Sequence, residues 1–139
     1  MIAIDTNVFV YALDATEPAK QIRAREFFQG ILASAETTVI PWQVAAELLA
    51  RFRKWEAAGK MTGNDVRARF GEFLNVWRLA MPTVEVFGVS FQIQARHSLS
   101  HWDSLLVAAC KEAGASRLYS EDMQHGAVYD GVEIVNPFL

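Results

Sequence analysis

Residues 101–122 read HWDSLLVAACKEAGASRLYSED and contain a predicted helix, a turn and a predicted strand in direct succession. Apolar residues recur at helical spacing over residues 102–113, and Gly114 follows them, as glycine commonly does at the end of a helix. The run at residues 117–120 is typical of a short buried strand. Because a helix that leads directly into a strand is part of a βαβ unit, this stretch predicts an α/β fold with a parallel sheet.

The rest of the chain continues this alternation. A chain of 139 residues with 52% hydrophobic and 12% aromatic content can fill one core, so we expect a single domain over residues 1–139. Its expected architecture is a central parallel sheet of short strands flanked by helices on both faces. The further expected strands are Met1–Ile4, Thr37–Ile40, Val84–Val89 and Val132–Val135, and the further expected helices are Pro18–Ala35, Pro41–Ala58, Thr62–Ala80 and Ser90–His97.

Charge and cysteine content narrow the class of protein. Lys and Arg number 13 against 16 Asp and Glu, so the chain has no overall basic signature for nucleic acid. Residues 51–69 are an exception, with six basic and two acidic residues and therefore a local charge of +4. The single Cys110 cannot form an internal disulfide, which favours a reducing compartment. Asp5 interrupts the opening apolar run and no stretch is long enough to span a membrane, so we expect a soluble, cytoplasmic protein without a signal peptide.

Four acidic residues stand in apolar surroundings, where an unpartnered carboxylate is rare. Two of them directly follow predicted strands, and the other two lie early in helices that can reach the same carboxyl edge of the sheet, where functional residues collect. Carboxylates gathered there repel one another, and a bound Mg²⁺ or Mn²⁺ ion is the simplest way to offset that repulsion. One or two such ions can activate water and position a phosphate. The four acids are Asp5 in IAIDTN, Glu47 in QVAAELLAR, Asp103 in SHWDSLLVAA and Asp122 in LYSEDMQHG.

Each acid also has an ordinary structural interpretation. Asp5 could cap a helix, and Asp103, three residues after a serine, could close a capping box. Glu47 could pair with Arg51 one helical turn later, and Asp122 could be a turn residue. The metal-site interpretation therefore rests on the four acids as a set.

Several motifs taken together resemble a PIN domain, and within that family the VapC-type toxins of bacterial type II toxin–antitoxin systems. They are MIAIDTNVFVYALD, the helix with Glu47, LSHWDSLLVAACKEAGASRLYSEDMQHG and the closing VEIVNPF, and the resemblance runs the full length of the chain. It implies that Asp5, Glu47, Asp103 and Asp122 are catalytic, metal-binding acids. It also implies supporting roles for Thr6, Asn7, Ser120 and the adjacent acid Glu121. His101 departs from the aromatic or apolar residue that many relatives have before the WD pair.

The resemblance further implies a Mg²⁺- or Mn²⁺-dependent endoribonuclease held in check by a small antitoxin protein. For such an enzyme we expect in-line attack of water on the phosphodiester, which leaves a 3′-hydroxyl and a 5′-phosphate, and assembly as a homodimer. In such an enzyme Arg51, Lys54 and Arg67 would contact the RNA backbone, although a solvated helix face is the usual meaning of a basic run. Aromatic residues around Phe52 and Trp77 exceed what one helix face can bury, and a leftover groove would suit an antitoxin segment or a second subunit. The alternative function is a non-catalytic PIN-like module that binds RNA or protein.

Overall fold

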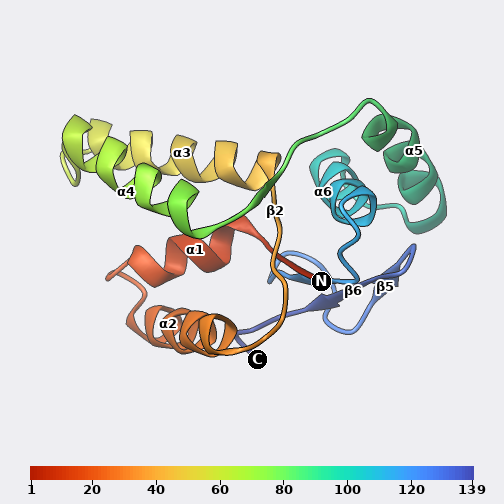
Figure 1. Ribbon diagram of the computed structural model, residues 1–139, viewed down its shortest axis with the longest axis horizontal. Helices are drawn as coiled ribbons and strands as arrows, with labels where there is room; N and C mark the ends of the chain where they lie inside the picture. Colours follow the sequence, from red (N-terminus) through yellow and green to blue (C-terminus); the bar gives the residue numbers. More distant parts are fainter.

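The computed structural model, which describes residues 1–139, is built around a sheet of short strands (Figure 1). The strands are β1 (Ile2–Ile4), β2 (Ile40–Pro41), β3 (Leu79–Ala80), β4 (Arg117–Tyr119), β5 (Val128–Tyr129) and β6 (Val132–Val135). Four of them run in the order β1-β4-β6-β5, in which only β5 is antiparallel to its neighbour. The parallel pair β2-β3 extends this sheet through a bridge between Ile2 and Thr38. The predicted central, mostly parallel sheet is confirmed.

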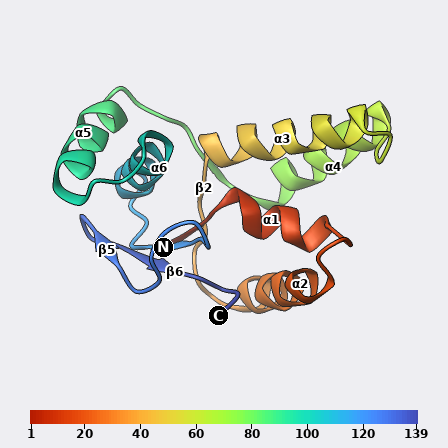
Figure 2. The ribbon, with the colours of Figure 1, turned by 180° about the vertical axis from the view of Figure 1, so that it is seen from behind.

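Six helices flank the sheet, and they too follow the prediction in outline. They are α1 (Thr6–Leu13), α2 (Pro18–Ala33), α3 (Trp42–Ala57), α4 (Gly63–Val76), α5 (Glu85–His97) and α6 (His101–Glu112). The α3–α4 pair and the α5–α6 pair lie on opposite sides of β2, and the carboxyl terminus lies beside α2 (Figures 1 and 2). None of these helices combines the length and the apolar content that a membrane crossing requires.

The middle of the sheet is covered on both faces. Ile2, Ala3 and Ile4 of β1 are all fully buried, as are Leu118 of β4 and Ile134 of β6. Such continuous apolar burial is typical of parallel strands between helical layers. Because β1 and β4 are parallel neighbours, the residues that follow them emerge together at the same edge of the sheet.

Two predictions about the middle of the chain were wrong. Residues 84–89 are not a strand, because all but the first belong to α5. Their β-branched content favours a strand locally, but Val86 and Ile93 lie two helical turns apart and are buried where α5 packs against α6. The helix predicted over residues 62–80 ends at Val76, and the residues beyond it pair with β2 as strand β3.

Candidate active site

Asp5 is fixed at the carboxyl end of β1. Its backbone N–H donates to the carbonyl of Tyr119, the last residue of β4, at 2.9 Å. Asp5 Oδ1 accepts from the Thr6 N–H and Oδ2 accepts from Ser120 Oγ, both at 2.7 Å. One oxygen therefore caps α1, as the structural interpretation expects, while the other is held by the residue that follows β4. The side chain is buried, with 4% of Asp5 exposed.

The pKa of Asp5 depends on its burial and on neighbouring acids. Burial raises the pKa of Asp5 from its ordinary 3.8 to about 6, even though the hydrogen bonds from Ser120 and Thr6 lower it. The negative charges of Asp122 and Glu47 raise the pKa further. Acids from two other segments of the chain thus lie close enough to Asp5 for their charges to act on it.

Glu47 reaches the same edge from α3. Its Oε2 accepts from Thr6 Oγ1 at 2.8 Å, so Thr6 contacts Asp5 through its backbone and Glu47 through its hydroxyl. Its Oε1 accepts from Gln43 Nε2 at 2.9 Å. Gln43 did not figure in the sequence interpretation, although its place one turn before Glu47 is a usable signal. Glu47 forms no ion pair with Arg51, so that structural interpretation is wrong.

Asp122 forms hydrogen bonds with Asn7 of α1 and with Ser120, two residues before it. Asn7 Nδ2 donates to both of its carboxylate oxygens, at 3.0 and 3.1 Å. The Asp122 N–H donates to Ser120 Oγ at 3.1 Å, and that same hydroxyl donates to Asp5. A single serine therefore links the two acids that follow the two central strands.

Asp103 occupies the first turn of α6 without serving as a cap. Its N–H donates to Ser100 Oγ at 3.2 Å, but its carboxylate accepts no hydrogen bond. Asp65 holds the equivalent position in α4, and there the box is closed, because Asp65 Oδ2 accepts from the Thr62 N–H at 2.9 Å. Burial raises the pKa of Asp122, and the charges of Glu121 and Asp103 add to that effect. Gln43 Nε2, which donates to Glu47, also donates to the carbonyl of Trp102 at 3.4 Å, so the start of α6 and the free carboxylate of Asp103 lie near the acidic edge.

A family model assigns residues 2–130 to the PIN domain. The chain belongs to the PIN domain family. The match covers the strands and helices that carry all four acids. No curated protein matches the chain in sequence.

Solved structures share the PIN fold at 15% sequence identity. A toxin–antitoxin complex from Klebsiella pneumoniae superimposes with a TM-score of 0.69, covering 99% of this chain and 98% of that one. VapC20 from Mycobacterium tuberculosis, described as a toxin that cleaves the sarcin–ricin loop, gives 0.64 over 88% and 90% of the two chains. VapBC2 from Rickettsia felis, bound to promoter DNA, gives 0.67 over 96% and 97%. At such identity these likenesses show the fold alone.

The acids of this PIN domain suit a divalent cation by chemistry and charge. All four offer carboxylate oxygens, which Mg²⁺ and Mn²⁺ prefer, and none of them has a cationic partner. No three acidic, histidine or cysteine side chains stand in the compact arrangement of a preformed metal site. Three of the four are instead held by separate hydrogen-bond donors. Each carboxylate oxygen has two lone pairs, so these donors can orient the acids and still leave lone pairs for an ion.

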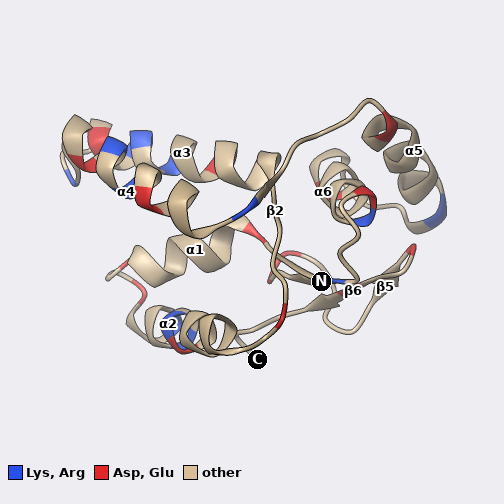
Figure 3. Cartoon of the chain, in the orientation of Figure 1, with Lys and Arg blue, Asp and Glu red and all other residues tan.

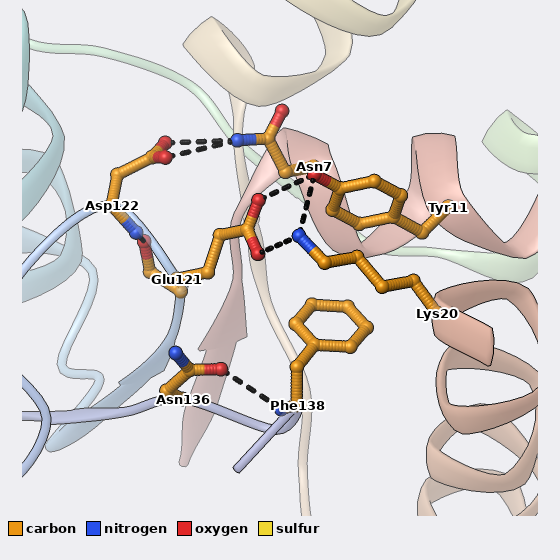
Figure 4. A network of polar contacts seen from close by, with 8 residues as sticks. Asn7, Tyr11, Lys20, Glu121, Asp122, Asn136 and Phe138 are labelled. Atoms are coloured by element: carbon orange, nitrogen blue, oxygen red, sulfur yellow. Dashed lines mark hydrogen bonds and ion pairs between the residues drawn. The ribbon is translucent and has the colours of Figure 1, made fainter. Parts of the chain in front are cut away.

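Glu121, the acid next to Asp122, points elsewhere. Its carboxylate accepts from Tyr11 Oη at 2.6 Å and from Lys20 Nζ at 2.9 Å, whereas Asp122 points to Asn7 (Figure 4). The sequence interpretation missed Tyr11 and Lys20. For Tyr11 a signal existed, because it lies one turn after Asn7 on the same helix. Lys20 gave none, since its contact with Glu121 joins distant parts of the chain.

The basic segment lies on the α3–α4 pair. Arg51, Lys54 and Arg67 are exposed, and none of them forms an ion pair. Arg51 is one helical turn beyond Glu47, so the basic surface begins beside the acidic edge. Figure 3 shows the basic positions of both helices interspersed with acidic ones.

An apolar groove of about 1010 Å³ opens beside Glu47, between α3, residues 78–84, α5 and α6. Trp42, Phe87 and Trp102 line it and are 48%, 60% and 63% exposed. The surplus of aromatic residues expected near Trp77 leaves a smaller hollow, of about 220 Å³. The larger apolar surface of the PIN domain is thus next to the acids rather than between α3 and α4.

Proposed function

We propose that this PIN domain is a divalent-metal-dependent endoribonuclease and the toxin of a toxin–antitoxin pair. The observation that carries the proposal is the hydrogen-bonded linkage of acids at one edge of the sheet, where Thr6 contacts Asp5 and Glu47 and Ser120 contacts Asp5 and Asp122, with no ion pair to offset their charge. Membership of the PIN family and the VapC-like fold support it. The proposed ligands are Asp5, Glu47, Asp103 and Asp122.

One or two Mg²⁺ or Mn²⁺ ions at these acids would supply Lewis acidity and offset the charge of the phosphodiester. The chain's own residues orient the ligands. Thr6 connects Asp5 to Glu47, Ser120 connects Asp5 to the backbone of Asp122, and Asn7 holds the Asp122 carboxylate. The proposed reaction is in-line attack of water on the phosphodiester, which leaves a 3′-hydroxyl and a 5′-phosphate.

RNA is the proposed substrate. The toxin VapC20, which has the same fold, is described as cleaving the sarcin–ricin loop. The unpaired Arg51, Lys54 and Arg67 begin one helical turn from Glu47, where they would contact phosphates on either side of the cleaved bond. A site built of carboxylates needs such cations nearby, because it repels the RNA backbone in the absence of positive charge.

We propose two protein partners, a small antitoxin and a second copy of the chain, and a cytoplasmic location. Complexes with the same fold from Klebsiella pneumoniae and Rickettsia felis support the antitoxin. The second copy would cover the groove beside Glu47, since exposed apolar side chains such as Phe87 and Val84 suit a permanent interface. Light scattering should then give twice the 15.5 kDa chain mass, and Phe87→Glu should give a monomer. A monomeric wild type would contradict the second copy.

Cleavage of RNA by the purified chain, freed of any partner, tests the proposed function. Cleavage should require Mg²⁺ or Mn²⁺, stop in EDTA and fall at least about a hundredfold in Asp5→Asn, because an electrostatic contributor to the transition state is lost. The new ends should be a 3′-hydroxyl and a 5′-phosphate. Equal cleavage in EDTA would contradict metal dependence. RNA binding without any cleavage would favour the non-catalytic module.

A further inference from the structure

One face of α1 binds both of the adjacent acids that follow β4, Glu121 and Asp122, and holds their side chains in different directions. Asn7 and Tyr11 lie four residues apart on that helix, so they occupy successive turns of the same face. Asn7 donates to Asp122, and Tyr11 donates to Glu121 (Figure 4). Helix α1, which Asp5 caps, therefore holds Asp122 at the acidic edge and holds Glu121 toward α2.

Lys20 of α2 completes the second contact. Its Nζ lies 2.9 Å from Glu121 Oε2 and 3.1 Å from Tyr11 Oη. It also lies over the Tyr11 ring, 4.5 Å from the centroid, and 5.8 Å from the centroid of Phe138. The two aromatic rings meet edge to face at 5.1 Å. The ammonium group thus contacts a carboxylate, a hydroxyl and two aromatic rings.

The contact with Lys20 matters because it neutralises the charge of Glu121. Among Asp5, Glu47, Asp103, Asp122 and Glu121, only Glu121 forms an ion pair, and its partner is Lys20. The Glu121 side chain is only 18% exposed, so without Lys20 its charge would be poorly solvated and adjacent to Asp122. A free Glu121 carboxylate would also be able to compete with Asp122 for a cation.

We propose that Glu121 is a positioning residue rather than a metal ligand, held by Lys20 and Tyr11 so that the turn over residues 120–122 presents Asp122 to the other acids. This inference rests on the proposed metal-dependent nuclease. Partners of this kind, which orient a ligand without touching the metal, typically change metal affinity or activity by about 10- to 100-fold when removed.

A double-mutant cycle tests the proposal, with Mn²⁺ affinity, kcat, KM and melting temperature measured for each protein. Glu121→Gln should keep Mn²⁺ affinity within about threefold of wild type, because its amide oxygen can still accept from Tyr11 and hold the turn, while Asp122→Asn, the matched control one residue away, should lose at least about tenfold. Lys20→Met should lower kcat about tenfold with little change in KM, and Lys20→Arg should restore it. The double variant Lys20→Met/Glu121→Gln should recover most of that loss, because the new glutamine side chain keeps the hydrogen bond from Tyr11 and no unpaired carboxylate remains.

Three results would overturn the inference while leaving the nuclease intact. A loss of Mn²⁺ affinity in Glu121→Gln equal to that in Asp122→Asn would make Glu121 a ligand. A raised KM in Lys20→Met that the second substitution does not correct would place Lys20 on the RNA. An unchanged kcat in Lys20→Met would mean that the pair has no positioning role. Failure of the wild type to bind Mn²⁺ would instead overturn the proposed metal site, and this inference with it.

Discussion

Two acidic regions of this molecule differ in whether basic side chains neutralise their charge. Asp130, in the turn between β5 and β6, is contacted by three basic side chains: Arg96 at 3.0 Å, His97 at 3.1 Å and Lys111 at 3.6 Å. The acidic edge has four carboxylates and no ion pair to any of them. Hydrogen bonding from His97 lowers the pKa of Asp130, with Arg96 and Lys111 contributing, whereas burial raises the pKa of Asp5.

The difference separates charges that the protein neutralises itself from charges that it leaves unneutralised. Asp130 joins α5 and α6 to the β5–β6 turn, and the protein supplies every cation that it needs. The acids at the carboxyl edge receive only neutral donors, namely Thr6, Asn7, Gln43 and Ser120. Neutral donors orient a carboxylate but leave its charge in place, which supports the proposed external cation.

The largest expected effect contrasts two helix starts that look alike in sequence. Asp103→Asn should lower the rate of RNA cleavage at least about a hundredfold, because its carboxylate is free of the α6 cap and belongs to the acidic group. Asp65→Asn, at the same position of α4, should leave the cleavage rate unchanged and lower the melting temperature slightly. Cleavage assays and thermal melts of both variants check this. Equal activity in the two variants would remove Asp103 from the site.

A smaller effect is expected from the structural group. Asp130→Asn should destabilise the fold by about 2 kcal/mol, since charge-assisted hydrogen bonds from His97 and Arg96 are lost. Urea unfolding measures this, with Glu133→Gln as a control that breaks an exposed ion pair. The two variants should differ clearly in midpoint. If they do not, Asp130 is no more important to the fold than a surface charge.

The pH dependence of stability should have opposite signs in the two regions. The folded pKa of Asp5 is raised, so its contribution is fully favourable below about pH 4 and is lost as the pH rises through about 6. The folded pKa of Asp130 is lowered, so its contribution is present above the ordinary value and is lost as the pH falls through the folded one. Without divalent metal, Asp5→Asn should therefore gain on wild type between pH 4 and about 6 in unfolding experiments. A constant difference across that range would contradict the raised pKa.

The smallest expected effect concerns the basic segment. Replacing Arg51, Lys54 and Arg67 together with Ala should weaken RNA binding and reduce the slope of log K against log salt by roughly 0.7 for each lost phosphate contact to a single strand. Mn²⁺ affinity should not change. An unaltered salt slope would make these residues an ordinary solvated helix face.

The sequence predicted most of the architecture because its signals were local. Apolar strands, a glycine after α6 and acids directly after strands identified the sheet and its edge. It failed at residues 84–89, where local β propensity favoured a strand and packing against α6 produced a helix. The two-residue strands β3 and β5 are too short to leave a pattern.

In the candidate site, too, the sequence predicted local features and missed contacts between distant parts of the chain. The four acids could be named from their surroundings, but their hydrogen-bond partners could be recognised only where the contact is local, as for Gln43 with Glu47. The Lys20–Glu121 pair spans 101 positions, and no spacing rule reaches that far. The sequence also could not decide whether Asp103 closes a capping box, because the motif is the same in α4 and only the side-chain geometry differs.

Thermal melting of wild type, Asp5→Asn and Asp103→Asn, each in EDTA and in Mn²⁺, tests the cation site most directly. Asparagine caps a helix as well as aspartate, so Asp5→Asn removes charge and keeps the α1 cap. Both variants should melt at or above the wild-type temperature in EDTA and gain little from Mn²⁺. The wild type should gain roughly 2.7 kcal/mol at about 100 times the dissociation constant. If both variants are much less stable than wild type in EDTA and Mn²⁺ stabilises none of the three proteins, the acids are structural and the cation site does not exist.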